Sequence, residues 1–158
     1  MDIVRWGIIG PGRIAHKFAC DIDLVKNARL IACSSKDRAK AADFKEKYGL
    51  EFSGSYEEML SRPDIDAVYI ATTHNFHYEN AMLCLKYGKN ILCEKAFTVN
   101  AMQAEEIFTE AAKKKLFVME AMWARFLPAA AWVREQVRNN AIRSEERRVG
   151  KECRDRWS

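Results

Sequence analysis

A charged pair, Glu94 and Lys95, ends an apolar stretch of the chain at Cys93. Two adjacent charges are costly inside a hydrophobic core but natural at the mouth of an active site. A lysine there can carry a proton or donate a hydrogen bond to a substrate hydroxyl. We therefore predict that Glu94 and Lys95 lie at the mouth of an active site.

A glycine turn near the start of the chain predicts a site for phosphate groups. Residues 10–15 read Gly-Pro-Gly-Arg-Ile-Ala and follow the apolar run 3–9. This is the dinucleotide-binding pattern G-x-G-x-x-G/A, whose first glycine allows the turn and whose second lets a pyrophosphate approach the backbone. The helix that follows offers unpaired N–H groups and a partial positive charge. The residues expected at the cofactor are Gly10, Gly12, Arg13 and Ile14.

The residues after the apolar run 28–33 bear on which cofactor is bound. An acidic residue there would bind the adenosine ribose 2′-hydroxyl of NAD, whereas small hydroxyls followed by cations suit the 2′-phosphate of NADP. Asp37 favours NAD, but we place it at the N-terminus of a helix. We therefore predict that Ser35, Lys36 and Lys40 bind NADP(H), with NAD less favoured. The alternative is that these lysines lie on a solvated helix face.

Two histidines, His74 and His77, follow Thr72 at the end of another apolar run. Such a pair could bind a metal ion, but no third ligand stands at a usual spacing. No metal is therefore expected, and a polar wall for the nicotinamide or the substrate fits these residues better.

Strand and helix patterns alternate through about three quarters of the chain. Strands are predicted at residues 3–9, 28–33, 65–71, 90–93 and 116–119. Helices are predicted at residues 13–21, 37–48, 55–60, 76–87, 100–115 and 125–139. Strands separated by helices imply crossover connections within a parallel sheet. The predicted fold class is α/β, a Rossmann-like doubly wound parallel sheet with helices on both faces.

Size and composition indicate an ordinary globular protein. The 158 residues suffice for one full domain, with 49% hydrophobic and 30% charged residues. A net charge of +4 is small for this length, so neither nucleic acid nor a membrane is expected as a partner. Five scattered cysteines without a C-x-x-C pair, and no signal peptide, predict reduced thiols in a cytoplasmic protein.

The last segment, residues 143–158, has no apolar periodicity and holds six basic and four acidic residues. A basic arm for nucleic acid and a solvated, disordered tail are two interpretations. A third is favoured over both, because residues 143–154 resemble the translation of a widely used sequencing-library adapter; Asp155 departs from it. We therefore expect an artefactual tail, with the true reading frame lost near Ile142.

Together these motifs resemble those of the Gfo/Idh/MocA oxidoreductases. The resemblance is carried by residues 10–15, 72–77 and 94–96, and it extends over about residues 3–142. Within the family, residues 92–95 and 119–128 are most similar to the branch of dihydrodiol dehydrogenase and D-xylose 1-dehydrogenase. The resemblance implies a Rossmann domain that binds NAD(P) and an oxidoreductase that acts on CH–OH groups.

The resemblance also implies roles for single residues. The lysine of the family's Glu-Lys-Pro motif lies beside the nicotinamide and substrate and corresponds to Lys95, next to Glu94; Ala96 stands in place of the proline. The family's T-P-N-x-x-H motif corresponds to Thr72, to His74, which replaces its asparagine, and to His77. The resemblance thus implies cofactor contacts for Thr72, His74, Glu94 and Lys95. It implies a catalytic site that contains His77, Glu94 and Lys95.

Three segments are expected in the chain. Residues 1–120 form the dinucleotide-binding domain, residues 121–142 begin a helical part of a second, substrate-binding domain, and residues 143–158 form the tail. Trp123 and Arg125 match a Trp-x-Arg-Phe segment of the branch and are expected at the cofactor; a core aromatic at the domain junction is the alternative for Trp123. The second domain of family members often forms a dimer interface, so we expect the parent protein to be a homo-oligomer.

The parent protein is therefore predicted to be an NADP(H)-dependent oxidoreductase that transfers hydride between nicotinamide and a small-molecule sugar or vicinal diol. The present chain carries the cofactor half of that site and is expected to be inactive alone. The alternative is a stand-alone dinucleotide-binding module without catalysis, which senses redox state or docks on a partner through the helix at 125–139.

Overall fold

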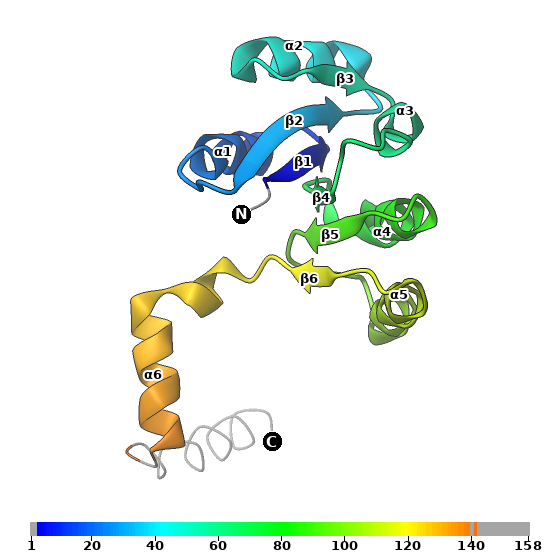
Figure 1. Ribbon diagram of the computed structural model, residues 1–158. Helices are drawn as coiled ribbons and strands as arrows, with labels where there is room; N and C mark the ends of the chain where they lie inside the picture. The colour runs from blue at the N-terminus through cyan, green and yellow to red at the C-terminus, as the bar shows by residue number, and fades with distance from the viewer. Residues whose placement is uncertain (1–2, 140, 142–158) are drawn as a thin grey trace, which may run out of the picture. The chain divides into compact units, whose positions relative to one another are not determined.

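The computed structural model describes residues 3–139 and residue 141, and it contains a parallel sheet of six strands (Figure 1). The spatial order of the strands is β3-β2-β1-β4-β5-β6. The strands are β1 (Val4–Ile9), β2 (Ala28–Ser34), β3 (Phe52–Gly54), β4 (Ala67–Ile70), β5 (Asn90–Cys93) and β6 (Val118–Glu120). The order reverses between β1 and β4, which is where a doubly wound sheet opens a crevice for a ligand.

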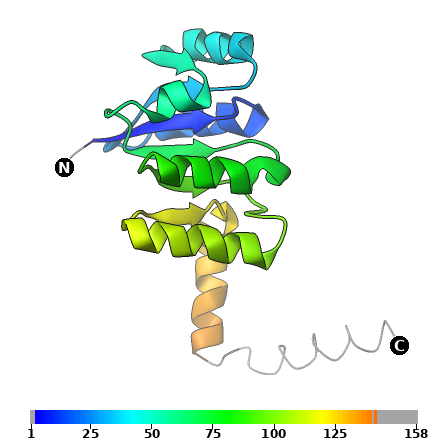
Figure 2. The ribbon, with the colours of Figure 1, turned by 90° about the vertical axis from the view of Figure 1, so that its right-hand side faces the viewer.

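Helices cover both faces of the sheet, as predicted (Figures 1 and 2). The helices of this unit are α1 (Arg13–Ile22), α2 (Arg38–Tyr48), α3 (Tyr56–Leu60), α4 (His77–Lys86) and α5 (Ala101–Lys114). Neighbouring residues of β1 point to opposite faces: Ile8 packs with α1 and α2, whereas Ile9 packs with α3, α4 and α5. Both side chains are fully buried. The predicted doubly wound α/β fold is thus confirmed.

Several helix ends follow from single residues. Ser55 and Glu58 form a reciprocal capping box at the start of α3. Asn100 accepts a hydrogen bond from the Gln103 amide at the start of α5. Gly49 ends α2 in the left-handed conformation, with φ of 62°.

Three local predictions differ from the structure. The edge strand β3 was not predicted, because three residues ending in glycine show no alternation of apolar and polar side chains. Strand β6 begins at Val118 rather than at residue 116. The helix predicted at 125–139 begins only at Pro128, as α6 (Pro128–Arg138), after the 3-10 turn η2 (Trp123–Phe126). Proline disfavours helical backbone in the preceding residue, and Leu127 is extended.

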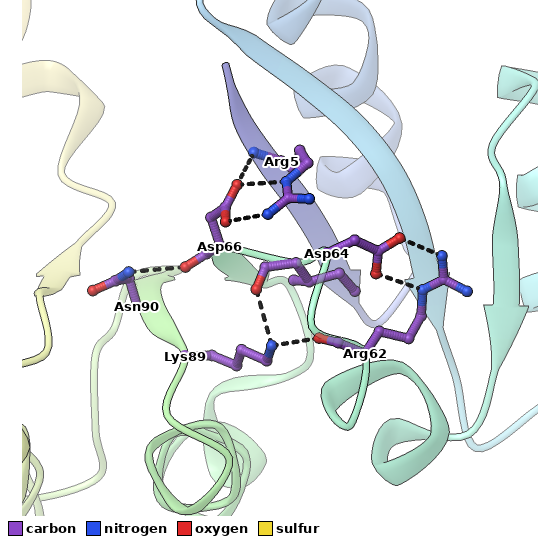
Figure 3. A network of polar contacts seen from close by, with 7 residues as sticks. Arg5, Arg62, Asp64, Asp66, Lys89 and Asn90 are labelled. Carbon is purple, nitrogen blue, oxygen red and sulfur yellow. Dashed lines mark hydrogen bonds and ion pairs between the residues drawn. The ribbon is translucent and has the colours of Figure 1, made fainter. Parts of the chain in front are cut away.

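The amino ends of the strands are tied together by a polar network (Figure 3). Asp66, just before β4, accepts hydrogen bonds from the backbone amide and the guanidinium of Arg5 on β1. The ammonium of Lys89, which is 7% exposed, donates to the carbonyl oxygens of Arg62 and Ile65. Asn90, at the start of β5, donates to the carbonyl of Asp66. These hydrogen bonds stabilise the amino-terminal ends of the strands, which lie opposite the ends that form the crevice.

The chain divides into two compact units, and the division falls between Ala121 and Met122. Of the second unit, η2 and α6 are described, and within it the Arg134 guanidinium donates to the carbonyl of Arg125. The tail predicted at residues 143–158 lies outside the described residues.

Candidate functional site

A cavity of about 640 Å³ opens at the carboxyl ends of β1, β2 and β4. This is the place where parallel α/β sheets bind ligands. Its lining residues are Gly10, Pro11, Gly12, Arg13, His16, Ser35, Lys36, Asp37, Lys40, Tyr56, Ala71, Thr72, Thr73 and Phe76. The predicted glycine turn and the residues after β2 thus line the same cavity.

Gly10 is required by the fold itself. Its φ of 89° lies in the region that side chains rarely adopt, and a Cβ atom would lie 2.8 Å from Thr72 Cγ2 and 3.0 Å from the Thr72 amide nitrogen. The missing side chain lets the turn after β1 pass close to the end of β4.

Gly12 is different, because the fold leaves room for a side chain at this position. A Cβ atom on Gly12 would meet only the Ala71 carbonyl oxygen, at 4.0 Å, and the backbone φ is an ordinary −91°. Gly12 is the N-cap of α1, with no side-chain cap and no acidic residue in the first turn. The N-terminus of α1 therefore offers N–H groups and the positive end of its dipole to an anion.

Cations line the cavity beyond the glycine turn. The ammonium of Lys36 lies 4.6 Å from the centroid of the Phe76 ring. This contact joins the end of β2 to the turn η1 (His74–Phe76), which follows β4. Arg13 and Lys40 contribute two further cations to the lining. Together they give this cavity a predominance of positive charge.

The one carboxylate in the lining, that of Asp37, caps α2. Asp37 Oδ1 accepts hydrogen bonds from the amides of Ala39 and Lys40, and Oδ2 lies 3.7 Å from Lys40 Nζ. The Asp37 amide in turn donates to the Ser35 hydroxyl. The predicted place of Asp37 at the N-terminus of a helix is confirmed, and its Oδ1 caps that helix.

His77 is buried, with only 1% of its surface exposed. Its Nε2 lies 3.0 Å from the Thr72 carbonyl oxygen and its Nδ1 lies 2.8 Å from the Ala96 carbonyl oxygen. The enclosed ring lies outside the cavity lining. His77 links the end of β4 to the turn after β5.

Glu94 and Lys95 lie on that turn after β5. Glu94 Oε1 accepts a hydrogen bond of 2.6 Å from the Tyr69 phenol, and Oε2 accepts one from the Lys95 amide. The side chain of Lys95 is exposed. The peptide bond between Lys95 and Ala96 is cis.

The structure brings most predicted cofactor residues together and leaves others outside the cavity lining. The predicted residues that line it are Gly10, Gly12, Arg13, Ser35, Lys36, Lys40 and Thr72. The predicted residues of the same unit that lie outside its lining are Ile14, His74, Glu94 and Lys95. Trp123 and Arg125 belong to the second unit, where Trp123 is 65% exposed.

Sequence reasoning missed several residues of this site. His16, Tyr56 and Phe76 line the cavity, and Tyr69 binds Glu94. His16 was detectable in principle, because it lies one helical turn beyond Gly12. Tyr69 gave no signal, because it looks like any other large residue of a buried strand.

The described part of the chain offers no metal cluster and no membrane-spanning helix. No group of three or more histidine, cysteine, aspartate or glutamate side chains there is arranged to hold a metal ion. No helix there has both the length and the apolar character needed to cross a bilayer.

A family model described as an oxidoreductase family with an NAD-binding Rossmann fold matches residues 4–122. The match covers the entire sheet and the cavity. The chain belongs to the Gfo/Idh/MocA oxidoreductase family. Family membership favours the oxidoreductase hypothesis over a dinucleotide-binding module without catalysis.

Curated relatives of this Gfo/Idh/MocA chain include two kinds of dehydrogenase. D-xylose 1-dehydrogenase (NADP(+)) of Hypocrea jecorina is 40% identical over 85% of this chain and 38% of its own. Trans-1,2-dihydrobenzene-1,2-diol dehydrogenase of Xenopus tropicalis is 36% identical over 87% of this chain and 43% of its own. The chain thus spans about two fifths of the length of these relatives.

Solved structures share the fold of the Gfo/Idh/MocA chain. An NAD binding oxidoreductase from Klebsiella pneumoniae is 30% identical with a TM-score of 0.77, covering 87% of this chain and 39% of its own. A 3-ketoreductase from Actinomadura kijaniata, solved with TDP-benzene and NADP, is 29% identical with a TM-score of 0.82, covering 89% of this chain and 45% of its own.

Proposed function

We propose that this chain is the cofactor-binding part of an NADP(H)-dependent oxidoreductase that transfers hydride between nicotinamide and the carbinol carbon of a sugar or vicinal diol. The observation that carries the proposal is the open space at Gly12, where the fold would accommodate a side chain and none is present. A helix N-terminus without a side-chain cap, beside a cavity lined with cations, can bind the phosphate groups of a dinucleotide.

The described residues fit such a cofactor. The N–H groups at the start of α1 would bind the diphosphate at Gly12, with Arg13 in the same lining. When bound, the nicotinamide supplies the two-electron chemistry as a hydride acceptor or donor. The chain's own contribution is therefore to bind and orient the cofactor and to provide a proton carrier.

NADP is the cofactor that the end of β2 suits better. Lys36, Lys40 and the Ser35 hydroxyl lie in the lining, and a 2′-phosphate needs positive charge and hydrogen-bond donors. One oxygen of the Asp37 carboxylate caps α2 and the other lies 3.7 Å from Lys40 Nζ, so we propose that this carboxylate serves the helix and Lys40 rather than the ribose 2′-hydroxyl of NAD. The Hypocrea jecorina relative, D-xylose 1-dehydrogenase (NADP(+)), carries the same cofactor in its name.

Lys95 is the proposed proton carrier. Its side chain is exposed on a turn whose backbone is bound on both sides, through Glu94 to Tyr69 and through the Ala96 carbonyl to His77. During oxidation Lys95 would accept the hydroxyl proton of the substrate as hydride leaves its carbon. Glu94 and His77 would position this turn rather than transfer protons.

The substrate is proposed to be a sugar or a vicinal diol, as the names of the curated relatives suggest. Because the chain spans only about two fifths of those relatives, we propose that a second domain, beginning near residues 121–142, supplies the remaining substrate contacts and an oligomer interface. The cofactor contacts expected of Trp123 and Arg125 are part of the same proposal.

The test is turnover by the complete protein, expressed from its source gene read through the codon for Ile142. NADP⁺ reduction is followed at 340 nm with pentoses, hexoses and vicinal diols, for the wild type and for Lys95→Met. We expect NADP⁺-dependent turnover that falls by about 100-fold to 10,000-fold in Lys95→Met while NADPH binding is kept. Turnover that Lys95→Met leaves unchanged would contradict the role of Lys95.

A further inference from the structure

His16 is a half-buried residue of α1 that also lines the cofactor cavity. It lies one helical turn beyond Gly12, on the side of α1 that faces α2. The proposed reaction assigns it no role.

The orientation of the His16 ring is held by aromatic residues of α2. The ring centroid lies 4.8 Å from that of Phe44 and 5.5 Å from that of Tyr48. Nδ1 lies 2.8 Å from the Tyr48 phenol oxygen, which also lies 3.4 Å from the His16 carbonyl oxygen. One nitrogen of the ring is therefore committed to Tyr48, and Nε2 has no hydrogen-bond partner among the described residues.

The face of α2 that packs against His16 also carries a cation, Lys40. Lys40, Phe44 and Tyr48 follow one another at intervals of four residues, so they lie along one face of the helix. Since His16 packs against the last two, it lies on the face of α2 that also carries Lys40. Both residues line the cavity, as does Lys36.

We propose that His16 Nε2 donates a hydrogen bond to the 2′-phosphate of the bound NADP(H), as a specificity-determining contact alongside Lys36 and Lys40. The shorter contact of the Tyr48 phenol is the one to Nδ1, at 2.8 Å against 3.4 Å to the His16 carbonyl oxygen, so we assign its single proton to Nδ1, which places the ring proton on Nε2. The inference rests on the proposed function, because it requires the cofactor to bind in this cavity. It goes beyond that function by assigning cofactor discrimination to a residue of α1.

The binding test compares two amide substitutions in the 158-residue chain. His16→Asn keeps a polar group at the position of Nδ1 but removes the Nε2 donor, whereas His16→Gln places an amide donor near the position of Nε2. Lys17→Gln is the matched control: it removes a cation from the next residue of α1, whose ammonium pairs with Asp21 and which is outside the cavity lining. Dissociation constants are measured for NADPH and NADH by nicotinamide fluorescence.

We expect His16→Asn to weaken NADPH binding by about tenfold, the effect of one hydrogen bond to a charged group, and to change NADH binding by less than about twofold. His16→Gln and Lys17→Gln should bind NADPH nearly as the wild type does. Unchanged NADPH binding in His16→Asn overturns the inference. Equal weakening of NADPH and NADH also overturns it, because the contact would then be to the diphosphate. A wild-type chain that binds no NADPH overturns the proposed function as well.

A measurement on the unaltered chain keeps the inference testable if His16→Asn does not fold. The ¹⁵N resonance of His16 Nε2 should move on addition of NADPH and stay in place on addition of NADH. Resonances that respond alike to the two cofactors overturn the assignment to the 2′-phosphate.

Discussion

The phenol of Tyr69 donates a hydrogen bond of 2.6 Å to Glu94 Oε1. Tyr69 is 3% exposed, and its ring stacks on Phe18 with centroids 4.1 Å apart. Burial and the neighbouring Glu94 carboxylate raise the pKa of Tyr69, so the phenol keeps its proton at neutral pH. Because the other oxygen of Glu94 accepts from the Lys95 amide, Tyr69 anchors the backbone of the residue that we propose as the proton carrier.

Removing this anchor should slow the reaction more than it weakens cofactor binding. In the complete protein, Tyr69→Phe should lower kcat by about fivefold to tenfold, because the lost hydrogen bond to a carboxylate lets the turn with Lys95 move. NADPH affinity should change little, since Tyr69 is outside the cavity lining. Steady-state kinetics and a cofactor titration measure the two effects separately.

Tyr78→Phe is the matched control for that experiment. The Tyr78 phenol also donates to a carboxylate, that of Glu106, but it does so between α4 and α5. Its loss should leave kcat unchanged. Equal kinetic effects of the two substitutions would show that the Tyr69 bond has no special relation to Lys95.

The two glycines of the turn after β1 should respond differently to alanine. Gly10→Ala should destabilise the fold by about 2–4 kcal/mol, because it combines a positive φ with a backbone clash. Gly12→Ala should change the free energy of unfolding by less than about 1 kcal/mol, since a Cβ atom there meets no atom closer than 4.0 Å. Urea denaturation followed by circular dichroism measures both.

Gly12→Ala should nevertheless weaken NADPH binding by at least about tenfold, because the methyl group stands where the diphosphate approaches the backbone. A folded Gly12→Ala chain with wild-type NADPH affinity would mean that the cofactor does not bind at the start of α1.

His77 should contribute chiefly to stability and to the placement of the turn after β5. His77→Phe keeps a ring in the buried site but removes the N–H that donates to one of the two carbonyl oxygens, those of Thr72 and Ala96, which should cost about 1–3 kcal/mol. His77→Gln, which can still donate to one of them, should recover part of this loss. Wild-type unfolding free energy in His77→Phe would rule out the positioning role.

The sequence predicted those parts of the fold that depend on local chemistry. Ser55, Asn100 and Gly49 mark helix ends because their side chains or backbone satisfy the terminal groups directly. The strand β3 was missed because its pairing with β2 depends on tertiary contacts rather than on its own three residues. The start of α6 at Pro128 was predictable, because proline disfavours helical backbone in the preceding residue, here Leu127.

The candidate site was predictable to a similar extent. The place of Gly12 in the cavity follows from the glycine pattern after β1, and that of Lys36 follows from its position directly after β2. The enclosure of His77 by two carbonyl groups was not predictable, because Thr72 and Ala96 lie on loops that only the folded sheet brings together. The same applies to the bond between Tyr69 and Glu94, which joins β4 to the turn after β5.

The network at the amino ends of the strands should make stability fall in acid (Figure 3). The hydrogen bonds from Arg5 hold the pKa of Asp66 below its ordinary value of 3.8. The unfolded chain therefore binds more protons near that pH, so this stabilisation is complete above about pH 5 and is lost as the pH falls through the folded-state pKa. Asp66→Asn should lower the free energy of unfolding at pH 7 by about 1 kcal/mol, a value reduced for partial exposure of the pair, and by less at pH 3.

The control for the acid experiment is Asp43→Asn, which alters an exposed carboxylate on α2. It should leave the pH dependence of stability unchanged. An Asp66→Asn chain whose stability loss is the same at pH 3 and pH 7 would contradict the assigned linkage.

The most direct test of the central claim is a titration of the 158-residue chain with NADPH and with NADH, followed by energy transfer from tryptophan to nicotinamide. We predict saturable binding of NADPH that is at least about tenfold tighter than that of NADH, and a ratio that falls toward one in Lys36→Gln. No binding of NADPH, or tighter binding of NADH, would contradict the claim that this cavity holds NADP(H).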